Sequence, residues 1–100
     1  MNIIIPMDGN NLEESKISLV HEVKFWLYLE INKGKMQNEK FFAKREDIEN
    51  YPEIVVVSTE KEDVCPFMEE GIAVLVAPFQ KYVEDIVEAY LFKELHDLNV

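Results

Sequence analysis

The sequence predicts an α/β fold, in which a mixed five-stranded sheet carries helices packed on it. Five short runs of apolar, β-branched or aromatic residues alternate with polar segments, and each of the last two runs precedes a helical pattern. Strands joined through a helix form right-handed crossovers with parallel pairing, whereas strands joined by a tight turn pair antiparallel. With 100 residues, 48% of them hydrophobic, the chain is expected to form one domain, residues 1–100, around one core.

The first three predicted strands lie in the N-terminal half. Residues 2–6 form a short β-branched run that ends in proline, which indicates a buried strand. After a loop rich in Asp, Gly and Asn, residues 23–31 form a long strand of aromatic and branched side chains. Gly34 favours a tight hairpin in the turn at 32–35, because glycine readily adopts positive φ. Residues 37–43 should then pair back on the second strand.

The remaining two strands are continuous apolar runs at 54–58 and 72–76, a pattern typical of strands buried on both faces. The polar segment 44–53 before them contains a proline and allows at most one or two helical turns.

Two helices are predicted. The first runs from Thr59 or Asp63 as N-cap to Gly71 as C-terminal stop. Thr59 and Glu62 have the spacing of a capping box. The second helix covers 82–98, where apolar residues recur at helical spacing, and Val87 should be buried in its middle.

Composition excludes several classes of partner. Ten basic and twenty acidic residues give a net charge of −10, which opposes both nucleic-acid backbones and anionic membranes but suits a basic partner. The longest apolar run, 72–79, is far shorter than the ~20 residues of a membrane helix, and the N-terminus has no signal-peptide pattern. Cys65 is the only cysteine and forms no internal disulfide, which fits a reducing compartment. We therefore expect a cytoplasmic protein.

Five segments together resemble a known family. They are "MNIIIPMDG", "LEESKIS", "KFWLYLEI", "EGIAVLVAP" and the acidic C-terminal helix, and they occur in the order seen in the nitrogenase iron–molybdenum cofactor biosynthesis domain. The resemblance implies a ribonuclease H-like fold with sheet order 3-2-1-4-5. It also implies a nitrogen-fixation-like accessory role, in which the ligand is an iron–sulfur or iron–molybdenum type cluster.

The chain departs from the family pattern in three loops. The family has a histidine–phenylalanine–glycine turn before its second strand, where this chain has His21, Glu22 and Val23 without a glycine. The segment 44–53 and the loop "STEKED" also lack the glycines that the family carries there. Glycine allows a backbone to approach a bulky ligand closely, so these losses indicate a degenerate site.

The implied sheet order predicts where a ligand would bind. Strands one, four and five would end at one edge of the sheet, where strand two begins, and open α/β sheets place ligands at such an edge. The residues expected there are Asp8, His21, Ser58 and Thr59.

His21 and Cys65 are the candidate metal ligands, as an imidazole and as a thiolate at a helix N-terminus. The alternatives are an exposed histidine at a strand start and a cysteine packed beside Val64 and Phe67. His96, expected in the last helical turn, is assigned no binding role.

Two functional hypotheses remain open. The leading one is a small non-enzymatic accessory protein that binds a metal cluster weakly at a degenerate site. The alternative is a ligand-free protein-interaction module on the same fold. Catalysis is not expected, because the chain has no phosphate-binding glycine loop and no nucleophile elbow, and its first strand offers isoleucines instead of metal-binding carboxylates.

Overall fold

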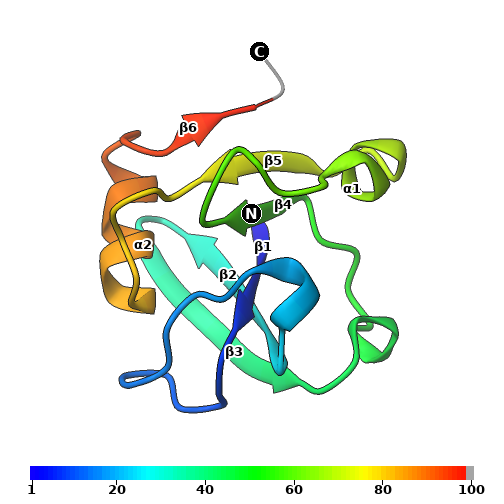
Figure 1. Ribbon diagram of the computed structural model, residues 1–100. Coiled ribbons are helices and arrows are strands. Elements are labelled where there is room, and N and C mark those ends of the chain that lie inside the picture. Colours follow the sequence, from blue (N-terminus) through cyan, green and yellow to red (C-terminus); the bar gives the residue numbers. More distant parts are fainter. Residues whose placement is uncertain (99–100) are drawn as a thin grey trace.

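A computed structural model describes residues 1–98 as a six-stranded mixed sheet with the order β3-β2-β1-β4-β5-β6 (Figure 1). The strands are β1 (Asn2–Met7), β2 (Phe25–Asn32), β3 (Lys35–Phe42), β4 (Ile54–Val57), β5 (Ala73–Val76) and β6 (His96–Asp97). The helices are α1 (Cys65–Glu69) and α2 (Val83–Leu91), and η1 (Val20–Glu22) and η2 (Arg45–Asp47) are single 3-10 turns. The predicted order of the first five strands is confirmed, but the predicted count of five is wrong because β6 extends the sheet.

The strand directions follow from the connections. β1 pairs antiparallel with β2 and parallel with β4, and β4 pairs parallel with β5. The β2–β3 hairpin turns through Lys33 and Gly34, both at positive φ (54° and 76°), as a type I′ turn requires. The register of this hairpin shifts between Tyr28 and Glu30, and Asn38 on the opposite strand takes a φ of 57°. This irregularity is a β-bulge, which bends the edge strand.

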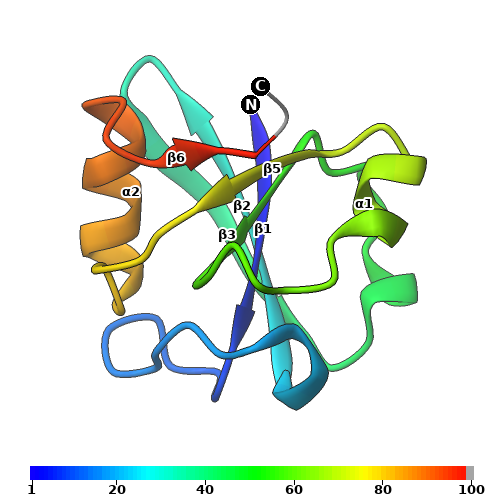
Figure 2. The same ribbon diagram turned by 45° about the horizontal axis from the view of Figure 1, so that its top comes forward.

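Alternation along the strands builds a core on each face of the sheet. One core contains Ile3, Ile5, Met7, Leu27, Leu29 and Val56 and is covered by Val83 and Ile86 of α2. The other contains Ile4, Trp26, Tyr28, Val55, Val57 and Val74 and is covered by Phe67 of α1. Figure 2 shows the two helices on opposite sides of the sheet. Leu27 and Leu29 belong to the first core and Trp26 and Tyr28 to the second, because successive side chains of a strand point to opposite faces.

The first helix is shorter than predicted. Its N-cap is Val64, with no capping side chain, and Pro66 lies in its first turn, where a missing N–H costs little. The predicted capping box does not form, because Glu62 instead accepts a hydrogen bond from the Val20 N–H (2.6 Å). The predicted stop at Gly71 is confirmed, with a φ of 78°.

The second helix ends at Leu91, so the predicted span of 82–98 is wrong. The Lys93 N–H donates to the Tyr90 carbonyl (3.1 Å) and the Glu94 N–H to the Ala89 carbonyl (2.8 Å). These two bonds form a Schellman motif, with Lys93 at φ 58° in the position that glycine usually takes. The chain then turns back along β5 as β6.

Val87 is also less buried than predicted. Ile86, at 1% exposure, is the innermost residue in the middle of α2, and Val87 lies beside it with an intermediate exposure. Val87 packs against the edge of the core without entering it. No helix formed by residues 1–98 is long and apolar enough to cross a membrane.

Candidate functional site

The carboxyl ends of the parallel strands meet at one edge of the sheet, as predicted. β1, β4 and β5 run in the same direction, and Phe25 at the start of β2 pairs with Met7 at the end of β1. The segments that follow β1, β4 and β5 therefore lie at this edge, together with the segment that precedes β2. Ligands of open α/β sheets bind at edges of this kind.

A hollow of about 450 Å³ lies at this edge, beyond β4 and β5. Its lining residues are Ser58, Thr59, Glu60, Val76, Pro78 and His96. Ser58 and Thr59 follow β4 directly, and both were predicted at the site. The structure thus brings two hydroxyl groups, one imidazole and the Glu60 carboxylate together around a volume within the range of small-ligand sites.

His96 reaches the hollow because β6 pairs antiparallel with β5, where Val76 is its partner. The sequence prediction placed His96 at the far end of a helix, and the structure corrects this position to β6. No glycine or proline lies between Leu91 and His96 to mark the end of α2. The sequence therefore carries no strong signal that α2 ends before His96.

His21 lies outside the hollow, on the surface of η1. Its side chain is 73% exposed, and its Nε2 is 3.9 Å from Glu22 Oε2. The hydrogen bond from the Val20 N–H to Glu62 ties η1 to the loop after β4, so His21 is held near the edge but directed to solvent. This arrangement matches the alternative of an exposed histidine near a strand start.

Asp8 closes the loop that follows β1. Its Oδ1 accepts a hydrogen bond from the Lys16 N–H (2.8 Å), and its own N–H donates to the Lys16 carbonyl (2.9 Å). A carboxylate used in this way stabilises the loop and has less capacity left for a ligand.

Cys65 is the first residue of α1 and is exposed. Its N–H donates to Asp63 Oδ1 (3.3 Å). The alternative in which this thiol packs beside Val64 and Phe67 is therefore not what the structure shows.

Residues 1–98 contain no group of three or more His, Cys, Asp or Glu side chains that could hold a metal ion. The residues present thus do not fit a resident metal centre, which needs several converging ligands. What the edge offers is one imidazole, two hydroxyls and the Glu60 carboxylate.

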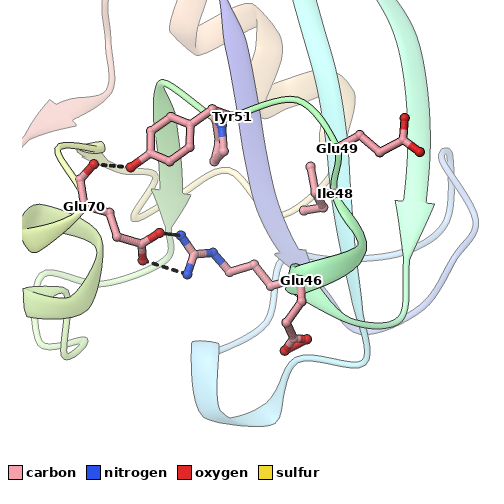
Figure 3. A pocket seen from close by; sticks show the side chains of 7 residues that line it. Glu46, Ile48, Glu49, Tyr51 and Glu70 are labelled. Carbon is pink, nitrogen blue, oxygen red and sulfur yellow. Dashed lines mark hydrogen bonds and ion pairs between the residues drawn. The ribbon is translucent and has the colours of Figure 1, made fainter.

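A second hollow, of about 400 Å³, lies between η2 and α1 (Figure 3). Arg45 spans it, with its guanidinium over the ring of Phe67 (4.9 Å to the centroid) and paired with the Glu70 carboxylate (2.8 Å). The Tyr51 hydroxyl donates to the Glu70 carbonyl, and Figure 3 shows Tyr51 and Glu70 facing each other. These contacts fasten η2 to α1, so we assign this hollow a structural role.

A cluster of polar side chains surrounds Glu30 on the α1 face of the β2–β3 hairpin. Its carboxylate accepts hydrogen bonds from the Tyr28 hydroxyl (2.6 Å) and the Asn38 amide (2.8 Å). These two bonds lower the pKa of Glu30, and burial together with the bond to Glu30 raises the pKa of Tyr28. The cluster ties the bulge at Asn38 to β2.

The fold defines the class of protein: a mixed α/β sheet with a helix on each face. The sequence matches no protein-family model and no curated protein. Among solved structures, it is similar to a "putative dinitrogenase" from Methanocaldococcus jannaschii (TM-score 0.77, 17% identity, 98% of this chain and 94% of that chain).

Two further solved structures share the fold. The protein PH0822 has a TM-score of 0.77 and 17% identity, over 97% of this chain and 96% of that chain. A "putative NifB protein" from Thermotoga, described as a member of the DUF35 family, has a TM-score of 0.69 and 14% identity, over 99% of this chain and 94% of that chain. At these identities the similarity shows a common fold.

Proposed function

We propose that this chain is a small non-enzymatic accessory protein, distantly related to nitrogenase-associated proteins, that contacts an anionic metal–sulfur cluster as cargo. The names of two proteins that share its fold refer to dinitrogenase and NifB, which agrees with the family resemblance of the sequence. In this proposal the sheet is a ribonuclease H-like sheet extended by one strand.

The observation that carries the proposal is the hollow at the carboxyl edge of β4 and β5. His96 supplies an imidazole, which is a good ligand for iron. Ser58 and Thr59 supply hydroxyl donors for the sulfide or oxide atoms of a cluster. One imidazole gives weak, reversible contact, and the Glu60 carboxylate beside it would repel an anionic cluster, which suits a carrier better than a permanent holder.

Anaerobic reconstitution with iron and sulfide, followed by desalting and iron analysis, tests the proposal. Wild-type protein should retain less iron per chain than one full cluster contains, and His96→Ala should retain less than wild type. His21→Ala is the matched control, since it removes another exposed imidazole outside the hollow. Equal iron retention by all three proteins would contradict the proposed site.

The second candidate function is a ligand-free protein-interaction module. It is favoured by the lack of a three-ligand metal group among residues 1–98 and by the net charge of −10. This candidate would be favoured if wild-type protein retained no more iron than a denatured sample.

A further inference from the structure

A groove of about 600 Å³ lies on the face of the sheet that α2 covers, opposite the face covered by α1. It is separate from the hollow at the sheet edge. It runs between the start of α2, the loop after β1 and one residue of β3. Its lining residues are Leu12, Glu13, Met36, Tyr82, Val83, Glu84, Asp85 and Val87. Its volume lies within the range of ~300–1,000 Å³ typical of binding pockets.

The floor of this groove is apolar. Leu12, Met36 and Val87 each pack against the core but keep part of their surface exposed. Tyr82 stands at the rim with 40% of its surface exposed. Val87 belongs to the hydrophobic stripe of α2, yet no other part of residues 1–98 covers it completely. A partly uncovered apolar floor of this kind gains stability when a partner fills it.

The charged groups that line the groove are all acidic. Glu84 and Asp85 lie in the first turn of α2, where carboxylates also stabilise the helix dipole. Glu13 has no such helical role, because it lies in a loop, where its N–H donates to Asn11 Oδ1 (2.9 Å). Its carboxylate therefore adds negative charge to the rim for a reason that the helix does not supply.

We propose that this groove binds a basic, amphipathic segment of a partner protein. An apolar side chain of the segment would cover Val87, and its Lys or Arg side chains would face Glu13, Glu84 and Asp85. The net charge of −10 would attract such a segment from a distance. The same charge repels a second copy of this chain, which makes a self-complementary use of the groove less favourable.

A capped hexapeptide of sequence KLFKLK is a suitable probe, with ELFELE as its charge-reversed control. We expect KLFKLK to shift the backbone amide signals of residues 12–13 and 82–87 in a two-dimensional NMR titration. ELFELE should leave those signals in place. Binding should weaken with added salt, because the rim charges are exposed.

Two matched pairs of variants separate the groove from general acidity. Glu13→Lys should weaken KLFKLK binding about fivefold, and Glu14→Lys less than about twofold. The two residues change the net charge equally, and both N–H groups bond to Asn11 Oδ1, but Glu14 does not line the groove. Val87→Ser should weaken binding about tenfold, whereas Leu91→Ser, at an exposed position of the same helix, should have little effect.

Three results would overturn the proposal. KLFKLK that does not bind at millimolar concentration would show that the groove has no affinity for basic apolar segments. Equal weakening by Glu13→Lys and Glu14→Lys would show that binding follows overall charge. Groove signals that shift with protein concentration alone would assign the groove to a second copy of the chain.

Discussion

His96 and Val76 are paired across β5 and β6, although the sequence places them at the end of one predicted helix and in a preceding strand. This pairing brings an imidazole to the carboxyl edge of the sheet beside Ser58 and Thr59. It exists because α2 stops at Leu91 and the chain reverses through Lys93. The candidate site therefore depends on the C-cap of α2.

The strain at Lys93 leads to the first prediction. Both helices end in Schellman motifs, with Gly71 at φ 78° after α1 and Lys93 at φ 58° after α2. Lys93→Gly should raise the free energy of unfolding by about 0.5–1 kcal/mol, and Gly71→Ala should lower it by about 1 kcal/mol, because a Cβ is unfavourable in this backbone region. Urea denaturation measures both changes. Opposite signs would show that the caps do not limit stability as described.

The packing of α2 gives the second prediction. Ile86 is 1% exposed against the sheet, whereas Val87 lies beside it at the groove. Ile86→Asp should lower the free energy of unfolding by more than about 3 kcal/mol, because it buries an unpaired carboxylate. Val87→Asp should cost no more than about half as much, since its carboxylate can reach water. Equal losses, measured by urea denaturation, would place both residues in the core.

The clamp between η2 and α1 gives the third prediction. Arg45 pairs with Glu70 while its guanidinium stacks on Phe67. A double-mutant cycle with Arg45→Met and Glu70→Gln should yield a coupling free energy of about 1 kcal/mol, at the upper end for partly exposed pairs. Arg45→Lys should not restore the lost stability, because an ammonium group does not reproduce the planar, two-point contact. A coupling near zero would mean that the pair is incidental.

The fourth prediction concerns pH. Hydrogen bonds from Tyr28 and Asn38 lower the pKa of Glu30 in the folded protein. A lowered carboxyl pKa contributes stability that is present above the unfolded value, about 4.3, and is lost as pH falls through the folded value. Tyr28→Phe should therefore raise the pKa of Glu30 toward its ordinary range, as read from the side-chain carboxyl carbon by NMR. Tyr90→Phe is the control, and an unchanged pKa in Tyr28→Phe would contradict the assignment.

Much of the fold was predictable because the strands depend on local patterns. The apolar runs of β4 and β5, the hairpin glycine and the alternation along β2 each have a direct physical cause in the sequence. The end of α2 was not predictable in the same way. Lys93 occupies a position where glycine is the usual signal, and the Leu95 and Leu98 side chains continue the helical spacing past the true end.

The candidate site was predictable only in part. Its edge follows from strand order, and Ser58 and Thr59 follow from their position after β4. His21 was predicted at the site by analogy with a family turn. In the structure the Val20 N–H donates to Glu62, which holds η1 in a position where the His21 imidazole faces solvent. The position of His96 depends on the chain reversal after α2, so an error of a few residues in the predicted end of that helix hid the proximity of His96 to Ser58 and Thr59.

The place where an anionic metal–sulfur species touches the protein can be measured directly. Tetrathiomolybdate, titrated anaerobically and followed by backbone amide NMR signals, serves as the probe. We expect shifts at Ser58, Thr59 and His96 that disappear in His96→Ala and persist in His21→Ala. Shifts centred on residues 20–23, or no shifts beyond those caused by an equal concentration of sulfate, would contradict this expectation.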